Sequence, residues 1–201
     1  MMTKNFIHGM SRAYDERMPI LSMLVAASLT VPSVRIALAF SPRGAMPPLV
    51  ERAAVAEAAA IWAPYGVSIA AVDPAGRGTD ATVLLTVIVS LSSVSPQAPW
   101  QVPLGAVEFA ANGTPRPVIR LFVDRVIRLL EGAQQTGAPP AAWPPLMRAQ
   151  VVGRAIGRVL AHEIGHVVLR SQEHARSGLM RGVQRSDELV EPSRHQYRLR
   201  D

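Results

Sequence analysis

The segment from Met147 to about Arg170 carries the strongest helical pattern in the chain, and any fold must bury its apolar side. Its apolar residues recur every three or four positions and form one stripe along the predicted helix: Val152, Ile156, Val159, Leu160, Ile164 and Val167. Three glycines, Gly153, Gly157 and Gly165, lower the stability of this helix. We therefore expect them to allow close packing against a sheet, or to leave room around a bound ion.

The same helix contains the motif H-E-x-x-H, formed by His162, Glu163 and His166. Residues four apart lie on one helix face, so both imidazoles can reach one ion at about 2.0–2.1 Å, the distance that zinc prefers. Glu163 lies about 100° around the helix from His162 and can flank the ion without binding it. It is then placed to accept a proton from a water molecule activated by the metal.

The motif is specific for a chain of this composition. Five histidines and nine glutamates in 201 residues give about 0.005 matches by chance, and this match falls inside a predicted helix. The alternative interpretation is a pair of histidines that only cap the helix or form hydrogen bonds within it.

A third histidine follows the pair. His174 lies beyond the predicted end of the helix, and a turn at Ser171 and Gln172 would bring it back to the same ion. Three protein ligands with an open fourth position are typical of catalytic zinc. The acidic residues that could supply the third ligand instead are Glu173, Glu188 and Glu191.

Residues 177–180, Ser-Gly-Leu-Met, predict a tight turn that ends in a methionine. Together with the histidines, this turn resembles the metzincin-type zinc metallopeptidases, whose pattern is H-E-x-x-H-x-x-G-x-x-H followed by a turn with a methionine beneath the metal. The resemblance covers roughly residues 34–182. It implies zinc (Zn2+) bound by His162, His166 and His174, Glu163 as general base, and Met180 as the floor of the site.

Two positions depart from the family pattern. Leu169 occupies the glycine position, and the third histidine comes two residues late, so we expect Ser171 or Gln172 to make the bend. Met180 could instead be an ordinary core residue, because methionine often fills gaps in cores. Tyr197 is a candidate for stabilising an oxyanion, although a tyrosine in a polar tail is more often a surface residue.

Outside this segment, short strand patterns alternate with helical ones. Strands are predicted at residues 34–40, 67–72, 81–91, 105–110 and 118–123, and helices at 49–62, from 125 to 131, and once in the tail. The continuous apolar run 81–91 predicts a strand buried on both faces. Asp124 is expected to cap the helix that follows it. The order predicts an α+β fold, and with the resemblance a zincin-like domain: a five-strand mixed, twisted sheet packed on a support helix and a long active-site helix.

The first 32 residues read as a signal peptide or disordered leader, and residues 33–201 as one domain. Lys4, Arg12 and Arg17 precede a 12-residue apolar stretch, 20–31, which is too short to span a bilayer. We expect cleavage near residues 27–33, and therefore a secreted or periplasmic protein. Without cleavage the protein would be cytoplasmic.

Composition excludes several classes of site. The chain has no cysteine, so a disulfide framework, a thiolate metal site and a cysteine nucleophile are all excluded. The net charge of +6 is compatible with binding to nucleic acid or to an anionic membrane surface. However, the arginines are scattered and no nucleic-acid motif is present, so we expect no nucleic-acid partner and no stable membrane span.

The sequence therefore predicts a zinc metalloendopeptidase that hydrolyses peptide bonds. In the family that it resembles, a short edge strand binds the substrate antiparallel to itself, and residues 105–109 are the candidate for that strand here. The alternative is a non-catalytic zincin-fold protein that binds a peptide or partner and holds a structural metal. Glu163 argues against this alternative, since a binding module has no need of a base.

Overall fold

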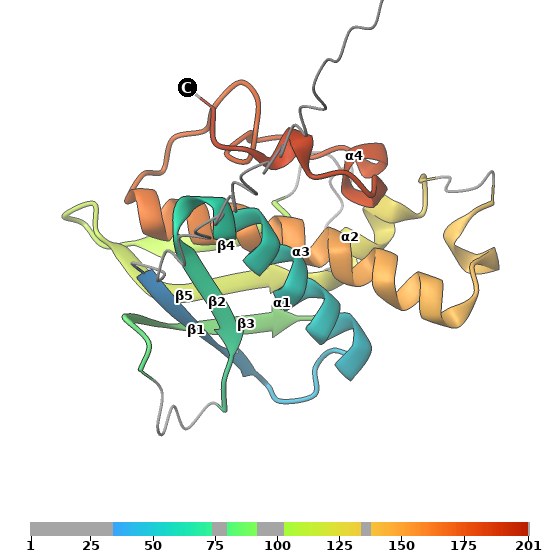
Figure 1. Cartoon of the computed structure of the whole chain (residues 1–201), viewed down its shortest axis with the longest axis horizontal. Helices are drawn as coiled ribbons and strands as arrows, with labels where there is room; N and C mark the ends of the chain where they lie inside the picture. Colours follow the sequence, from blue (N-terminus) through green and yellow to red (C-terminus); the bar gives the residue numbers. More distant parts are fainter. Residues whose placement is uncertain (1–33, 74–79, 92–102, 134–137, 201) are drawn as a thin grey trace, which may run out of the picture.

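The computed structural model describes residues 34–73, 80–91, 103–133 and 138–200 (Figure 1). The expected leader and most of the loop between the third and fourth strands lie outside these residues. The elements are, in chain order, β1 (Val34–Ser41), α1 (Pro48–Trp62), β2 (Val67–Ala71), β3 (Val83–Ser90), β4 (Gly105–Phe109), β5 (Pro115–Phe122), α2 (Val123–Leu130), α3 (Pro145–Leu169) and α4 (Ser186–Val190). Short 3-10 helices lie at Ala63–Tyr65, Pro140–Ala142 and His195–Tyr197.

The five strands form one sheet in the order β2-β1-β3-β5-β4. β1 pairs in parallel with β2 and β3, and β3 pairs in parallel with β5. β4 runs antiparallel to β5 at one edge, because the turn at Asn112 and Gly113 reverses the chain directly between them. The predicted α+β class with a five-strand mixed sheet is therefore confirmed.

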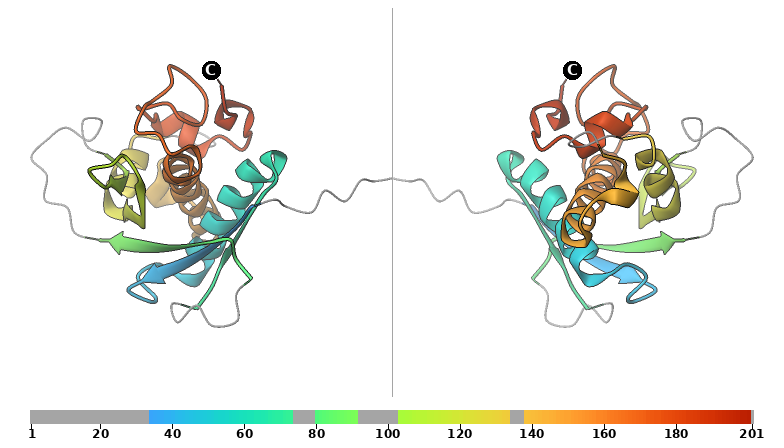
Figure 2. Two further views of the ribbon diagram at one scale, coloured as in Figure 1. Left: turned by 90° about the vertical axis from the view of Figure 1, so that its left-hand side faces the viewer. Right: turned by 90° about the vertical axis from the view of Figure 1, so that its right-hand side faces the viewer.

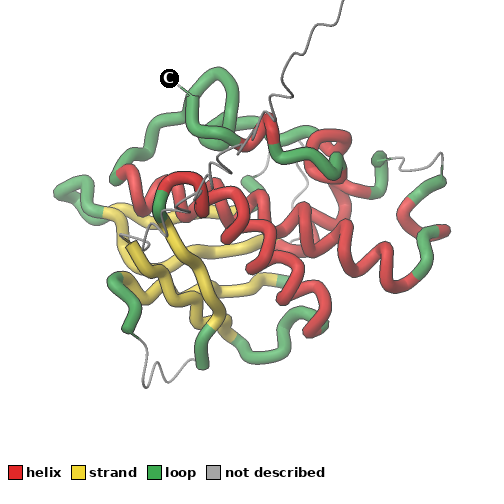
Figure 3. Tube along the Cα trace, in the orientation of Figure 1, coloured by secondary structure: helices red, strands yellow, loops and turns green. Residues whose placement is uncertain are grey.

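The long helices α1 and α3 lie on the same side of the sheet (Figures 2 and 3). The burial of β3 follows from this arrangement: Leu85 and Val87 point into the core, whereas Leu84 is 43% exposed. The expectation that this strand is buried on both faces was wrong. An apolar run in sequence does not reveal that both covering helices pack on one face.

α1 and α3 approach each other closely at two glycines of α3. A Cβ built at Gly153 would lie 2.7 Å from the carbonyl oxygen of Val50, and one at Gly157 would lie 2.5 Å from that of Ala54. These two glycines therefore allow a helix-to-helix contact, rather than the contact with the sheet that we expected. The close contact holds α3 against α1 on one face of the sheet, and the C-terminal half of α3 lies beside β4.

After α3 the chain turns back and runs over the C-terminal half of that helix (Figure 1). The segment that follows α3 adds apolar side chains to the core formed by the sheet and the two long helices, among them Leu179, Leu189 and Tyr197. Among the described residues, no helix is both long and apolar enough to cross a membrane.

α2 begins two residues earlier than the Asp124 cap predicts. Its N-cap is Phe122, with no side-chain cap hydrogen bond, and Asp124 instead forms an ion pair with Arg128 one turn later. The cap interpretation was wrong because β5 runs into the helix without an intervening turn.

Candidate metal centre

The two histidines of the motif lie in the last turns of α3, buried beneath the chain that returns over it. His162 is 7% and His166 is 6% exposed, and their Nε2 atoms lie 3.2 Å apart. Two nitrogens bound to one tetrahedral zinc at about 2.0–2.1 Å would lie about 3.3–3.4 Å apart. The pair therefore has the separation that a shared ion requires.

Backbone carbonyls fix which nitrogen of each ring faces the other. His162 donates from Nδ1 to the Leu179 oxygen at 2.8 Å, and His166 donates from Nδ1 to the Ser171 oxygen at 2.7 Å. A carbonyl oxygen only accepts, so the proton of each neutral ring must be on Nδ1. The free lone pairs are then on the two Nε2 atoms, which lie 3.2 Å apart. Metal-bound histidines commonly have such an outer hydrogen-bond partner on their other nitrogen.

His174 joins this pair from the loop after α3. Its ring centroid lies 5.2 Å from that of His162 and 5.0 Å from that of His166. One potential ligand nitrogen from each of the three rings lies within 4.8 Å of the others, so the cluster could hold a metal ion. Two histidines are buried and the third is exposed, which leaves the cluster open to solvent on one side.

The bend that returns His174 begins at Arg170 and continues at Ser171, whose hydroxyl accepts a hydrogen bond from the Glu173 N–H at 3.1 Å. Arg170 follows the last residue of α3 and has the left-handed backbone conformation, with φ 50° and ψ 39°. This is the conformation that a glycine usually supplies after a helix. An arginine therefore fills the structural role that the missing glycine left open.

The loop that carries His174 is fastened to the turn at residues 177–180. The Ala175 N–H donates to the Met180 oxygen at 2.9 Å, and Ala175 also forms an isolated bridge with Arg181. Gly182 lies against the imidazole, since a Cβ there would be 3.1 Å from Cγ of His174. The third histidine is thus positioned by the segment that follows it as well as by the bend before it.

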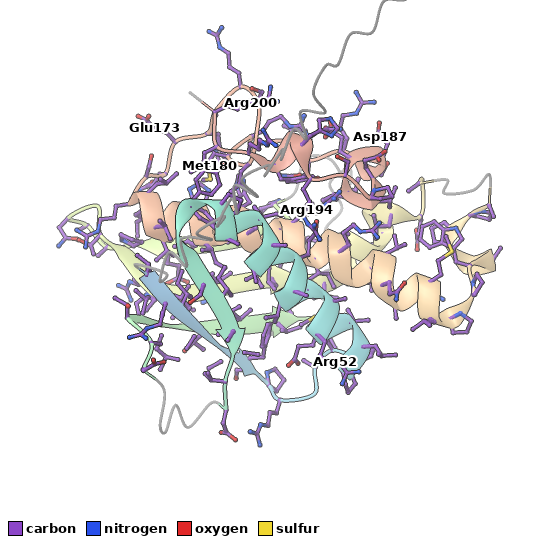
Figure 4. The ribbon with its side chains drawn as sticks, in the orientation of Figure 1. Arg52, Glu173, Met180, Asp187, Arg194 and Arg200 are labelled. Carbon is purple, nitrogen blue, oxygen red and sulfur yellow. The ribbon has the colours of Figure 1, made fainter. Side chains whose placement is uncertain are left out.

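Met180, labelled in Figure 4, packs directly on α3 at Gly165. A Cβ at Gly165 would come within 3.1 Å of the Met180 methyl carbon and even closer to its sulfur. Met180 is 6% exposed and does not line the pocket described below. Gly165 therefore makes room for this methionine next to His166.

Glu163 is 5% exposed and lies between α3 and β4. Burial raises the pKa of its carboxyl from 4.5 to about 8, because the charged form loses water without gaining a cation in the metal-free protein. Burial likewise lowers the pKa of His162 to about 4, and it lowers the pKa of His166. These shifts keep both rings neutral, the form that binds metals.

A pocket of about 320 Å³ contains the three histidines and Glu163. Its lining includes β4 with the residue before it, represented by Leu104, Gly105 and Val107, and the segment 181–184. Leu129 of α2 and Val159 of α3 also line it. The histidine cluster therefore opens into a cavity with space for part of a ligand.

No protein-family model, curated protein or solved structure matches this chain. The function must therefore be argued from the chemistry of the site.

Among the described residues, the group able to share an ion does not include the acidic rivals for the third ligand, Glu173, Glu188 and Glu191. Glu188 forms an ion pair with Arg181, and Glu173 is exposed on the outer side of its loop (Figure 4). In the part of the chain that the structure describes, the three histidines are the group able to share one ion.

Tyr197 is buried, contrary to the expectation of a surface position. Its ring lies under the Arg158 guanidinium at 4.4 Å, its hydroxyl donates to Gln184 at 3.5 Å, and it does not line the pocket. Sequence reasoning also missed Arg158, which is fully buried one turn before His162. The feature of the sequence that could have revealed it is a charged residue placed among the apolar positions of α3.

Proposed function

We propose that the chain is a zinc-dependent metallopeptidase with a zincin-like fold of the metzincin type. The observation that supports this proposal best is the convergence of three imidazoles on one point beside a buried glutamate, in a pocket bordered by the edge of the sheet. A purely structural zinc site would instead close the fourth position with a protein ligand.

His162, His166 and His174 would hold the zinc. When bound, zinc supplies Lewis acidity, which polarises the scissile carbonyl and makes the attacking water more acidic. The outer hydrogen bonds to Leu179 and Ser171 orient two of the ligand rings before any metal arrives.

Glu163 acts as the general base. It lines the same pocket as the histidines and lies on α3 next to His162. A cation held by the histidines would favour its charged form against the effect of burial, so its carboxylate could then accept a proton from the attacking water. It then passes this proton to the leaving nitrogen of the cleaved peptide bond. Gly105 packs against the side chain of Glu163 and limits its movement.

The substrate is a peptide or protein segment that binds along β4. In the described part of the chain, β4 pairs only with β5, which leaves the main chain on its other side available for strand addition. Four of its five residues line the pocket next to Glu163. A peptide bound there would pass in front of the three histidines. An exported protein would meet such substrates outside the cytoplasm.

The test is the cleavage of a fluorogenic peptide library by zinc-loaded protein, with and without a chelator. Glu163→Gln should abolish cleavage while the protein still binds one zinc, measured by metal analysis. The matched control is Glu173→Gln, which changes an exposed glutamate near the same loop and should leave activity and zinc content unchanged. Full activity in Glu163→Gln would remove Glu163 from the mechanism. Zinc binding by wild type without any cleavage would favour the non-catalytic binding protein.

A further inference from the structure

The main chain of Leu179 connects His162 to the C-terminal end of the chain. Its carbonyl oxygen accepts the hydrogen bond from His162 Nδ1 at 2.8 Å, and its N–H donates to the carbonyl oxygen of Arg198 at 2.8 Å. The orientation of one ligand ring therefore depends on where a residue close to the C-terminus lies.

Gly178 is required for this approach. It has a φ of +82°, and a Cβ built on it would lie 2.4 Å from the Arg198 carbonyl oxygen. Any other residue would thus be strained in its own backbone and would collide with the acceptor of Leu179. The turn at residues 177–180 and the main chain of Arg198 therefore pack directly against each other.

A buried arginine holds the chain that leads to Arg198. Arg158 donates to the carbonyl oxygens of Glu188 and Ser193, the latter at 2.8 Å, and its guanidinium covers the ring of Tyr197. It also forms an ion pair with Glu57 of α1 at 3.0 Å. Because a fully buried guanidinium is costly unless its donors are satisfied, these contacts define one position for the chain.

Two further contacts tie this chain to α1 and to the short helix after it. Arg194 forms an ion pair with Glu57 at 2.8 Å, and it lies between the C-terminal chain and α1 in Figure 4. The Leu199 N–H donates to the hydroxyl of Tyr65 at 2.8 Å. The Arg198 carbonyl is thus held on both sides by contacts that do not involve the metal cluster.

We propose that the C-terminal segment, residues 188–199, positions the metal ligand His162 by holding the main chain of Leu179 through its N–H. The proposal rests on the metal centre of the proposed function, but not on peptide hydrolysis. An outer hydrogen-bond partner orients a ligand ring and keeps it in the correct tautomer, and losing such a partner typically weakens metal binding about 10–100-fold. Residues 188–199 are then positioning elements, with no contact to a substrate.

The experiment measures the affinity for Zn2+ and the absorption spectrum of bound Co2+ in purified full-length variants. Gly178→Ala pushes the Arg198 carbonyl away from Leu179, and Tyr65→Phe removes the acceptor of the Leu199 N–H with little change in shape. Arg198→Ala is the matched control, because only its main-chain carbonyl is used and its side chain is exposed. The free energy of unfolding of each metal-free variant is measured in parallel.

We expect Gly178→Ala to weaken Zn2+ binding about 10–100-fold and to change the Co2+ spectrum. Tyr65→Phe should shift both in the same direction, and Arg198→Ala should match wild type. Tyr65→Phe decides the question if Gly178→Ala does not fold.

Lower stability with unchanged Zn2+ affinity and an unchanged Co2+ spectrum would overturn the proposal, because the segment would then only stabilise the fold. An effect of Arg198→Ala as large as that of Gly178→Ala would also overturn it. Wild-type protein that binds Zn2+ but cleaves no peptide would overturn the proposed function alone. Wild-type protein that binds neither metal would overturn both.

Discussion

Gly105 of β4 lies directly against the side chain of Glu163: a Cβ at Gly105 would be 2.7 Å from both Cγ and Oε1 of the glutamate. The edge strand β4 and the helix α3, which carries the H-E-x-x-H motif, therefore meet at Gly105, a residue without a side chain. The same contact brings the main chain of β4 to the pocket and limits the positions open to the carboxylate.

Gly105→Ala should displace the Glu163 carboxylate while leaving the histidines in place. Because a shift of about 1 Å in a catalytic group can cost on the order of 10²-fold in rate, we expect a loss of that size in peptide cleavage with zinc still bound. Gly132→Ala is the control, since a Cβ there meets only one atom, at 3.9 Å. Equal turnover of Gly105→Ala and wild type would show that this contact does not position the base.

Zinc should stabilise the folded protein through the three histidines. A ligand that binds only the folded state adds about 2.7 kcal/mol to the free energy of unfolding at a concentration 100 times its Kd. We expect this gain in wild type, a smaller gain in His174→Ala, and none in His162→Ala or His166→Ala, because the latter two remove the buried pair. Thermal unfolding with zinc and with a chelator measures the difference. A full gain in His174→Ala would place the third ligand elsewhere.

The stability of the metal-free protein should depend on pH through Glu163. Burial raises its pKa from 4.5 to about 8, so the folded state binds this proton more tightly than the unfolded state. The contribution of Glu163 to stability is therefore full below pH 4.5 and is lost as the pH rises to about 8, by up to about 5 kcal/mol. Glu163→Gln cannot titrate, so it should gain stability relative to wild type across this window.

Urea unfolding of both metal-free proteins between pH 4.5 and 8 tests this difference. His162, whose pKa burial lowers to about 4, makes a contribution that is lost as the pH falls from 6.5 toward 4. Both proteins contain this histidine, so its effect cancels when they are compared. A difference in stability that stays constant with pH would show that Glu163 is not held in a water-poor environment.

Arg170→Gly should stabilise the protein. A non-glycine residue in the left-handed conformation costs about 1–2 kcal/mol, and glycine removes this cost but loses more entropy on folding, so we expect a net gain of about 0.5–1 kcal/mol. Arg170→Ala keeps the strained conformation without the charge and should show no gain. Chemical denaturation of the three proteins separates backbone strain from the effect of the side chain. Equal gains in both variants would attribute the effect to the arginine charge.

The strands, the two long helices and the pairing of His162 with His166 were predictable because each depends on local periodicity. Hydrogen bonds between residues four apart define a helix, so a motif with that spacing places two imidazoles on one face wherever the helix lies. The Asn112-Gly113 turn is local in the same sense. For these features, residues close in sequence contain most of the information.

The position of His174, the support of His162 by Leu179 and the contact of Gly105 with Glu163 were decided only in the tertiary structure. The last two depend on segments far apart in sequence: a carbonyl held from the C-terminal segment, and an edge strand packed on α3. The position of His174 depends on the left-handed backbone of Arg170 and on the bridge between Ala175 and Arg181, neither of which a helical or strand period specifies. Buried donors and acceptors must find partners wherever the fold brings them together, and no local period specifies which partners these are.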